Sequence, residues 1–181
     1  MQLKYSDSEI LREFRNDREK GFRLLVTEYR ERLYFHIRRI VILHDDADDA
    51  LQNTFIKAWK SLDSFRSDSS LYTWLYRIAT NEALAQLKSR KKNGTIVFDN
   101  VDSFFAVSRE GDAYFDGDQA EKKLRNAILK LPDKQRLVFQ MKYYDDMPYE
   151  QISRIVDTSV GALKASYHHA VKKIEEYLEN D

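Results

Sequence analysis

The sequence contains no cysteine, and its 181 residues include only five glycines and two prolines. The lack of cysteine excludes disulfide bonds and thiolate metal sites, which is typical of proteins in a reducing compartment. Few glycines and prolines favour long helices over a sheet protein with many turns. Apolar runs long enough to span a membrane are absent, and the first ten residues lack the apolar region of a signal peptide. We therefore expect a soluble, cytoplasmic, all-α protein, long enough for one medium domain or two small ones.

Basic and acidic residues are balanced overall but unevenly distributed along the chain. Thirty of each sign give a formal net charge of zero. Residues 51–92 carry eight basic and three acidic side chains, whereas residues 93–119 carry one basic and six acidic ones. Segregation of this kind indicates different partners for different segments. Because residues 93–119 also hold three of the five glycines and lose the helical period, we predict an acidic linker at 93–117 between two small helical domains, at 1–92 and 118–181.

Hydrophobic periodicity predicts three helices before residue 63. Ser6 and Glu9 have the spacing of a capping box, and a six-turn helix follows from about 20 to 43. Asp45 and Asp46 are expected to cap the third helix. The face of this helix opposite its apolar stripe carries Asp49, Gln52, Asn53 and Ile56. Such a face fits either a protein-contact surface or a solvated polar surface. The aspartates here lack the glycine and terminal glutamate of a calcium loop, so no metal site is expected.

The segment 66–92 combines an apolar helical face with aromatic and cationic side chains. Serines before Leu71 can cap the helix, and its apolar positions are Leu71, Leu75, Ile78 and Ala79. Around them lie residues that a core does not require, namely Tyr72, Trp74, Tyr76, Arg77, Asn81, Lys88, Arg90, Lys91 and Lys92. Rings and cations together suit unstacked bases and backbone phosphates. An ordinary amphipathic helix with a frayed basic end is the plainer interpretation of this helix taken alone.

The C-terminal part has the pattern of a helix-turn-helix. Pro132 and Pro148 each open a helix, and a tight turn at Asp157 leads to a final helix capped by Ser159. Its expected core stripe is Leu163, Tyr167, Ala170, Ile174 and Leu178. The opposite face carries Lys164, Ala165, His168 and Lys172, with His169 at its edge, and Gly161 allows close backbone approach. This face is typical of a helix that reads duplex DNA. Because the two histidines are adjacent, they do not predict a zinc site.

Three segments, in this order, resemble the extracytoplasmic-function (ECF) sigma factors, the smallest initiation factors of bacterial RNA polymerase. They are DDALQNTFIKAW, FRSDSSLYTWLYRIATNEALAQLKSRKK and LPDKQRLVFQMKYYDDMPYEQISRIVDTSVGALKASYHHAVKKI. They look like the family's polymerase-binding segment, its minus-ten segment and its minus-thirty-five domain. The resemblance implies a region 2-like helical bundle at 1–92 and a region 4-like helix-turn-helix at 118–181, joined by the acidic linker.

The resemblance also implies a role for each group of residues. The clamp coiled coil of the polymerase largest subunit would contact Asp49, Gln52, Asn53 and Ile56. Minus-ten DNA would be melted and held by Phe65, Arg66, Ser69, Tyr72, Trp74, Tyr76, Arg77, Asn81, Lys88, Arg90 and Lys91. Minus-thirty-five DNA would be read by Ser159, Gly161, Lys164, Ala165, His168, His169 and Lys172. Flipping a base costs a few kcal/mol, which stacking and pocket contacts can offset without ATP.

The partners implied by the family are core RNA polymerase, promoter DNA and an anti-sigma factor, which is often membrane-bound. We expect no cofactor, metal or small-molecule substrate. The linker would thread the basic interior of the polymerase, although a flexible acidic tether explains its composition equally well. The chain departs from the family where Asn53 replaces a common Glu, where Asp157 replaces a usual Gly, and where Ala165 to His169 replace common arginines.

Two other classes of protein remain as alternatives. A stand-alone helix-turn-helix regulator explains residues 118–178 but leaves the aromatic, basic helix without a purpose. An enzyme acting on nucleic acid would need a carboxylate pair, a metal-spaced histidine cluster, a nucleophile with its base or a phosphate-binding glycine loop, and the sequence offers none of these patterns. We therefore predict a transcription initiation factor and not an enzyme.

Overall fold

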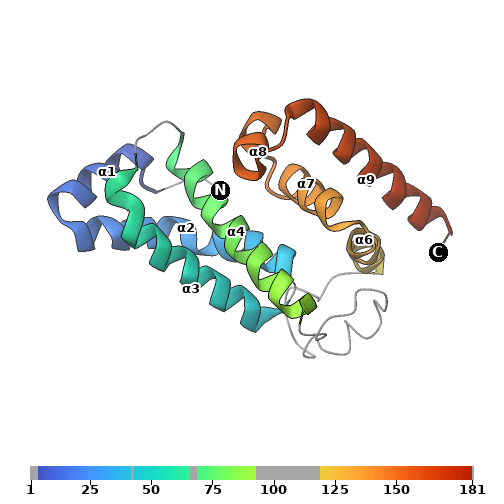
Figure 1. Cartoon of the computed structure of the whole chain (residues 1–181), viewed down its shortest axis with the longest axis horizontal. Helices are drawn as coiled ribbons and strands as arrows, with labels where there is room; N and C mark the ends of the chain where they lie inside the picture. The colour runs from blue at the N-terminus through green and yellow to red at the C-terminus, as the bar shows by residue number, and fades with distance from the viewer. Residues whose placement is uncertain (1–3, 42, 66–68, 93–118, 181) are drawn as a thin grey trace. The chain divides into compact units, whose positions relative to one another are not determined.

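The computed structural model of the chain describes residues 4–41, 43–65, 69–92 and 119–180. Within these ranges every regular element is helical (Figure 1), which confirms the all-α prediction. The chain divides into two compact units, Met1–Lys88 and Ser89–Asp181. The predicted linker at 93–117 lies outside the described residues. Among the helices that the structure describes, none is long and apolar enough to cross a membrane.

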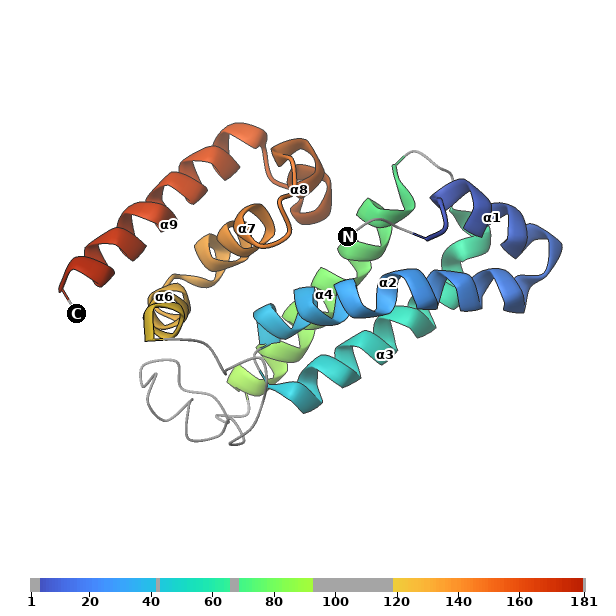
Figure 2. The ribbon, with the colours of Figure 1, turned by 180° about the vertical axis from the view of Figure 1, so that it is seen from behind.

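The N-terminal unit is a bundle of helices in which α2 packs against both α1 and α3 (Figure 2). Its elements are α1 (Asp7–Asn16), α2 (Arg18–Val41), α3 (His44–Ser61), the short 3₁₀ helix η1 (Leu62–Ser64) and α4 (Leu71–Lys92), which continues past the end of the unit. The bundle buries apolar side chains from all four α-helices, including Ile10, Leu25, Leu33, Ile37, Ala50, Ala58, Leu75 and Ala79. The amphipathic pattern of each helix therefore accounts for this core.

The contact between α1 and α2 depends on a glycine. A Cβ atom at Gly21 would overlap the backbone of Phe14, so only glycine lets the two helices approach this closely. The helix starts follow the sequence prediction in part. Ser6 caps α1 in the expected capping box with Glu9. The predicted aspartate cap of α3 is wrong, because Leu43 occupies the cap position, but Asp45 and Asp46 both lie in the first turn, where acidic residues favour a helix N-terminus.

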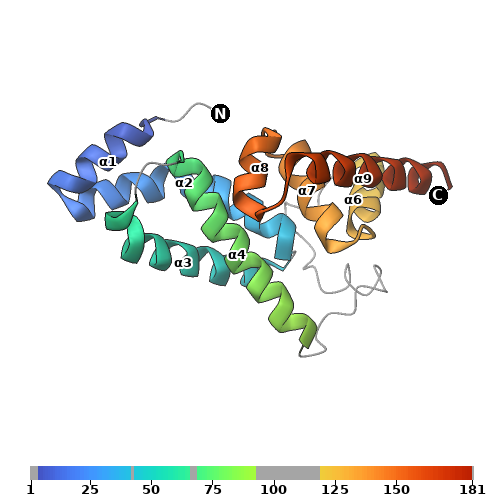
Figure 3. The ribbon, with the colours of Figure 1, turned by 45° about the horizontal axis from the view of Figure 1, so that its top comes forward.

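The C-terminal unit consists of three shorter helices packed along a long one (Figure 3). These are α6 (Gln119–Leu129), α7 (Asp133–Tyr143), α8 (Tyr149–Val156) and α9 (Val160–Asn180). Pro132 and Pro148 occupy the cap positions of α7 and α8, close to the predicted helix starts. A core cluster joins α6, α7 and α9 through Ala127, Ile128, Leu131, Phe139, Ala170 and Ile174.

The turn between α8 and α9 depends on one left-handed residue. Asp157 adopts φ 52° and ψ 51°, a conformation that an aspartate tolerates better than most residues but that glycine adopts without strain. This explains the turn that the sequence predicts there. The predicted core stripe of α9 is confirmed at Leu163, Ala170 and Ile174. It is wrong at Leu178, which is 39% exposed.

Candidate protein and nucleic-acid interfaces

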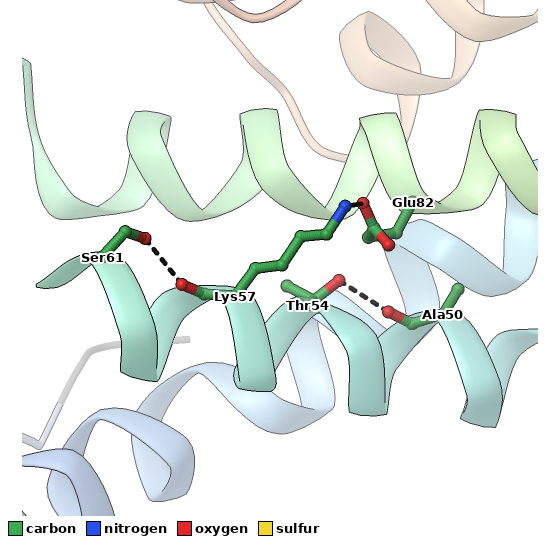
Figure 4. Close-up of polar contacts among 5 residues, drawn as sticks. All are labelled: Ala50, Thr54, Lys57, Ser61 and Glu82. Carbon is green, nitrogen blue, oxygen red and sulfur yellow. Dashed lines mark hydrogen bonds and ion pairs between the residues drawn. The ribbon is translucent and has the colours of Figure 1, made fainter.

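One face of α3 is exposed over about two turns. Asp49, Gln52, Asn53 and Ile56 all lie on the surface, and Ile56 is 43% exposed. The opposite face is buried, and Thr54 there donates its hydroxyl to the carbonyl of Ala50 at 2.7 Å (Figure 4). The helix therefore satisfies its inward polar group internally and presents an isoleucine among polar side chains outward. An exposed isoleucine framed by hydrogen-bonding groups suits a protein-contact surface.

Polar side-chain contacts join α3 to α4. The ammonium of Lys57 pairs with the carboxylate of Glu82, as Figure 4 shows. Near the other end of α3, Gln86 donates to the buried carboxylate of Asp46 at 3.1 Å. A buried carboxylate needs such a donor to offset the loss of water. These two pairs connect side chains of α3 with side chains of α4.

The first turn of α4 has a local cap and a distant one. Ser70 accepts a hydrogen bond from the backbone N–H of Thr73 at 3.2 Å, which confirms that a serine of the preceding loop caps the helix. The backbone N–H of Leu71 donates to Oδ2 of Asp7 at 3.0 Å. The other oxygen of Asp7 accepts from the hydroxyl of Tyr29 at 2.5 Å. The start of α4 is thus fixed against both α1 and α2.

The aromatic side chains of α4 do not all reach the surface. Tyr76 is only 3% exposed, so the prediction that the core does not require its ring is wrong. Its ring lies 4.7 Å from that of His36, and Nε2 of His36 lies 2.9 Å from Oγ1 of Thr80. The contact with α2 therefore occupies this side of α4. Tyr72 stacks on Tyr76 with ring centroids 4.1 Å apart and remains half-buried.

The other minus-ten candidates form a stripe on α4. Trp74, Arg77, Asn81 and Lys88 follow one another at helical spacing, and all except the half-buried Trp74 are exposed. The ring of Phe65 approaches that of Trp74 at 5.3 Å and links the end of η1 to this stripe. Ser69 and Arg90 are half-buried. Arg66 and the side chain of Lys91 lie outside the described residues.

The chain before Phe65 is held by an arginine that the sequence did not single out. Arg18 pairs with Asp63 at 2.7 Å, donates to the carbonyl of Trp59 at 3.1 Å and lies 4.6 Å from the centre of the Trp59 ring. A cavity of about 480 Å³ adjoins it, lined by Leu11, Phe14, Arg15, Asn16, Arg18, Leu62, Asp63 and Phe65. Arg18 lies in α2 and contacts residues of α3 and η1, so no pattern within one helix predicts its role.

The exposed face of α9 matches the sequence prediction. Ser159 accepts from the backbone N–H of Ala162 at 3.3 Å and so caps the helix as expected. The side chains predicted to face away from the core are all exposed, namely Lys164, Ala165, His168, His169 and Lys172. At Gly161 a Cβ would meet no atom within 4 Å, so the surface there is open. The charge of Lys172 is partly offset by Glu176, 3.8 Å away.

Comparison with known proteins accounts for both units. The family model for sigma-70 region 2 matches residues 25–93, and that for sigma-70 region 4 matches residues 121–174. The ECF RNA polymerase sigma-E factor of Escherichia coli (strain K12) is 31% identical over 185 residues, which cover 97% of this chain and 95% of that protein. This chain belongs to the ECF sigma factors. The RNA polymerase sigma-H factor of Pseudomonas aeruginosa is 29% identical over 189 residues, covering 96% and 94% of the two proteins.

Two solved structures resemble this sigma factor over most of their length. CnrH in complex with the cytosolic domain of CnrY has a TM-score of 0.72 at 22% identity, covering 97% of this chain and 98% of that one. The sigma factor RpoE in complex with the anti-sigma factor NepR from Bartonella quintana has a TM-score of 0.70 at 26% identity, covering 90% and 99%. The first likeness, at this identity, concerns the fold alone.

Membership of the family confirms the predicted role. The chain is a transcription initiation factor of RNA polymerase, and the stand-alone regulator is not favoured. Sigma factors are transcription factors and not enzymes as a family.

Proposed function

We propose that this sigma factor uses three faces on its two units, one to bind core polymerase and two to recognise promoter DNA. We also propose that it acts in the cytoplasm. The exposed face of α3 binds core polymerase, the stripe on α4 captures the melted minus-ten strand, and the outer face of α9 reads the minus-thirty-five duplex. The observation that carries this proposal is the α4 stripe, where half-buried Trp74 adjoins the exposed hydrogen-bonding groups of Arg77 and Asn81. A ring beside a guanidinium and an amide suits an unstacked base and its phosphate.

The α3 face supports polymerase binding through its mixed chemistry. Ile56 supplies an exposed apolar centre, and Asp49, Gln52 and Asn53 supply hydrogen-bonding groups around it. Interfaces commonly combine a central apolar contact with a polar rim. The amide of Asn53, where the family commonly has a carboxylate, would make a neutral hydrogen bond in place of an ionic one.

On α4, base capture begins before the helix. Phe65, Arg66 and Ser69 precede the helix, and Asn81 lies on the stripe that follows them. Tyr72 adds a ring, and Lys88, Arg90 and Lys91 add charge for the backbone. Tyr76 supports Tyr72 from within the core and is not itself a DNA contact in this arrangement. Stacking contributes about 1–3 kcal/mol per base, comparable with the cost of unpairing one.

The α9 face supports duplex binding through its first three turns. Ser159 and Gly161 lie at the start of α9, where the helix would approach the DNA backbone. Lys164, Ala165 and His168 project from the following turns. His169 and Lys172 lie at the edges of this face. The lysines of this face are Lys164 and Lys172, and Glu176 partly offsets the charge of Lys172, so the affinity of the face for duplex DNA depends on the polymerase and minus-ten contacts made by the same molecule.

Two further parts of the proposal concern regulation and the linker. The structural relatives CnrH and RpoE are each bound to another protein, and for RpoE that protein is an anti-sigma factor. We expect an anti-sigma factor to hold this chain inactive in the same general manner. Residues 93–117 join a region 2 domain at 1–92 to a region 4 domain at 118–181, and their acids suit the basic interior of the polymerase.

The experiment uses holoenzyme reconstituted with core polymerase and promoters that it selects from a random DNA library. Asn81→Ala should lower open-complex formation, followed by permanganate reactivity of unpaired thymines, by about tenfold. Lys164→Ala should weaken minus-thirty-five binding by about tenfold. Its binding to a template that is already melted at the minus-ten element should be unchanged. Asn180→Ala and Lys122→Ala, at exposed sites elsewhere, are the matched controls. Normal opening by Asn81→Ala would contradict the base-capture role of α4.

A further inference from the structure

The carboxylate of Asp7 joins three helices of the N-terminal unit. It lies in the first turn of α1, accepts from the hydroxyl of Tyr29 on α2, and accepts from the backbone N–H of Leu71 on α4. Leu71 is the first residue of α4, so its N–H is one of four that a helix leaves without an internal partner. Asp7 therefore caps α4 from 64 residues earlier in the chain.

The orientation of Asp7 is set by the buried tyrosine. Tyr29 has no exposed surface. Burial, reinforced by the hydrogen bond to Asp7, raises the pKa of the Tyr29 hydroxyl far above its ordinary value of 10.0. The hydroxyl therefore keeps its proton and donates a hydrogen bond to Oδ1. Oδ2 is then held toward α4, where a carboxylate also interacts favourably with the positive end of the helix dipole.

The hydrogen bond lies beside the proposed DNA contacts. Ser69 precedes Leu71 by two residues, and Tyr72 and Trp74 follow it by one and three. A helix is stiff, so a shift of its first turn moves the side chains of that turn together. The chain before Phe65 is anchored separately, by Arg18 through Asp63. Both ends of the segment between η1 and α4 are thus held by side chains of the first two helices.

We propose that Asp7 is a positioning residue for promoter opening, which places the first turn of α4 for capture of the minus-ten strand. The inference rests on the proposed role of α4. Its alternative is that Asp7 contributes to the stability of the bundle and to nothing else. The two differ in one respect, because a stabilising residue has no effect on DNA affinity once the variant is fully folded.

The test measures the affinity of holoenzyme for a fluorescent single-stranded DNA that carries the non-template minus-ten sequence of a selected promoter. Binding is measured at a temperature where circular dichroism shows each variant fully folded. Asp7→Asn keeps the size of the side chain but replaces one acceptor oxygen with a donor amide. We expect its Kd to rise about tenfold, with core binding unchanged. Asp7→Ser, a smaller side chain, should give the same direction, so the test does not depend on one variant.

Tyr29→Phe removes the hydrogen bond that orients the carboxylate but keeps the oxygen that accepts from Leu71. It should lower stability and raise the Kd in the same direction as the Asp7 variants, but by less. An unchanged Kd in both folded Asp7 variants would overturn the proposal and leave a stabilising role. Asn81→Ala separates the two levels of the account. If it binds the strand as tightly as wild type, the role of α4 fails and this inference with it. If only Asn81→Ala loses affinity, the inference alone fails.

Discussion

Lys57 of α3 is paired with Glu82 of α4, and each of the two lies next to a residue with a proposed contact. Lys57 follows Ile56 of the proposed polymerase surface, and Glu82 follows Asn81 of the proposed DNA-binding stripe. A direct side-chain contact therefore connects these two proposed surfaces. Docking onto the polymerase would carry α4 with it as one body.

Breaking this pair should cost little stability. The side chain of Lys57 is 60% exposed and that of Glu82 is 13% exposed, so water screens the pair from the side of the lysine. We expect Glu82→Gln to lower the free energy of unfolding of the N-terminal unit by about 0.5–1 kcal/mol. Tryptophan fluorescence follows this unit alone, because Trp59 and Trp74 are the two tryptophans of the chain. Lys60→Met, at an exposed lysine of the same helix, is the control, and a loss above about 2 kcal/mol would show that the pair is not screened.

Tyr29 predicts a specific alkaline weakness. Burial and the bond to Asp7 raise its pKa in the folded state, whereas the unfolded residue titrates near its ordinary value of 10.0. Above pH 10 the unfolded state therefore binds fewer protons than the folded state, and stability falls as pH rises. Between pH 9 and 11 the wild type should lose about 1.4 kcal/mol more than Tyr29→Phe in total, because the unfolded tyrosine is half titrated at pH 10. Urea unfolding of both proteins at pH 9 to 11 measures the difference, and parallel curves would refute the buried, protonated hydroxyl.

Asp157 predicts a gain in stability from a substitution toward glycine. Its φ of 52° costs an ordinary residue about 1 kcal/mol, whereas glycine adopts it freely. Asp157→Gly should stabilise the C-terminal unit by up to about 1 kcal/mol, and Asp157→Val should destabilise it by about 1–2 kcal/mol. Hydrogen exchange of the α8 and α9 amides reports both effects. Equal exchange in the two variants would mean that the turn does not limit the stability of this unit.

The basic end of α4 predicts a change in salt dependence. If Arg90 and Lys91 contact phosphates, replacing both with alanine removes two counterion-releasing contacts. The slope of log K against log salt for promoter binding by holoenzyme should then become shallower by about 1.5. Arg12→Ala with Arg30→Ala removes two exposed cations from α1 and α2 and should leave the slope unchanged. The same slope in both double variants would remove Arg90 and Lys91 from the interface.

Local signals predicted the helices and their exposed faces well. The Ser6 capping box, the cap at Ser159 and the prolines before α7 and α8 each act within a few residues, so the sequence contains all the information that they need. The outward faces of α3 and α9 follow from helical periodicity for the same reason.

Contacts between helices distant in sequence were not predictable in this way. The sequence predicted a surface ring at Tyr76, but the ring packs against His36 of α2. It predicted a helix cap at Asp46, but this carboxylate accepts a hydrogen bond from Gln86 of α4. The sequence did not predict the contacts of Asp7 and Arg18, because their partners lie in other helices. Periodicity assigns a residue to a face, but tertiary packing decides which helix covers that face.

The most direct test of the account is whether the purified protein co-elutes with core RNA polymerase on gel filtration. The wild type should form a stable complex, and Asp49→Ala with Gln52→Ala on the exposed face of α3 should abolish it. Glu19→Ala with Glu31→Ala, at exposed carboxylates of α2, should bind as the wild type does. Retention of the complex by the α3 double variant, or its loss in the α2 control, would contradict the assignment of the polymerase surface to α3.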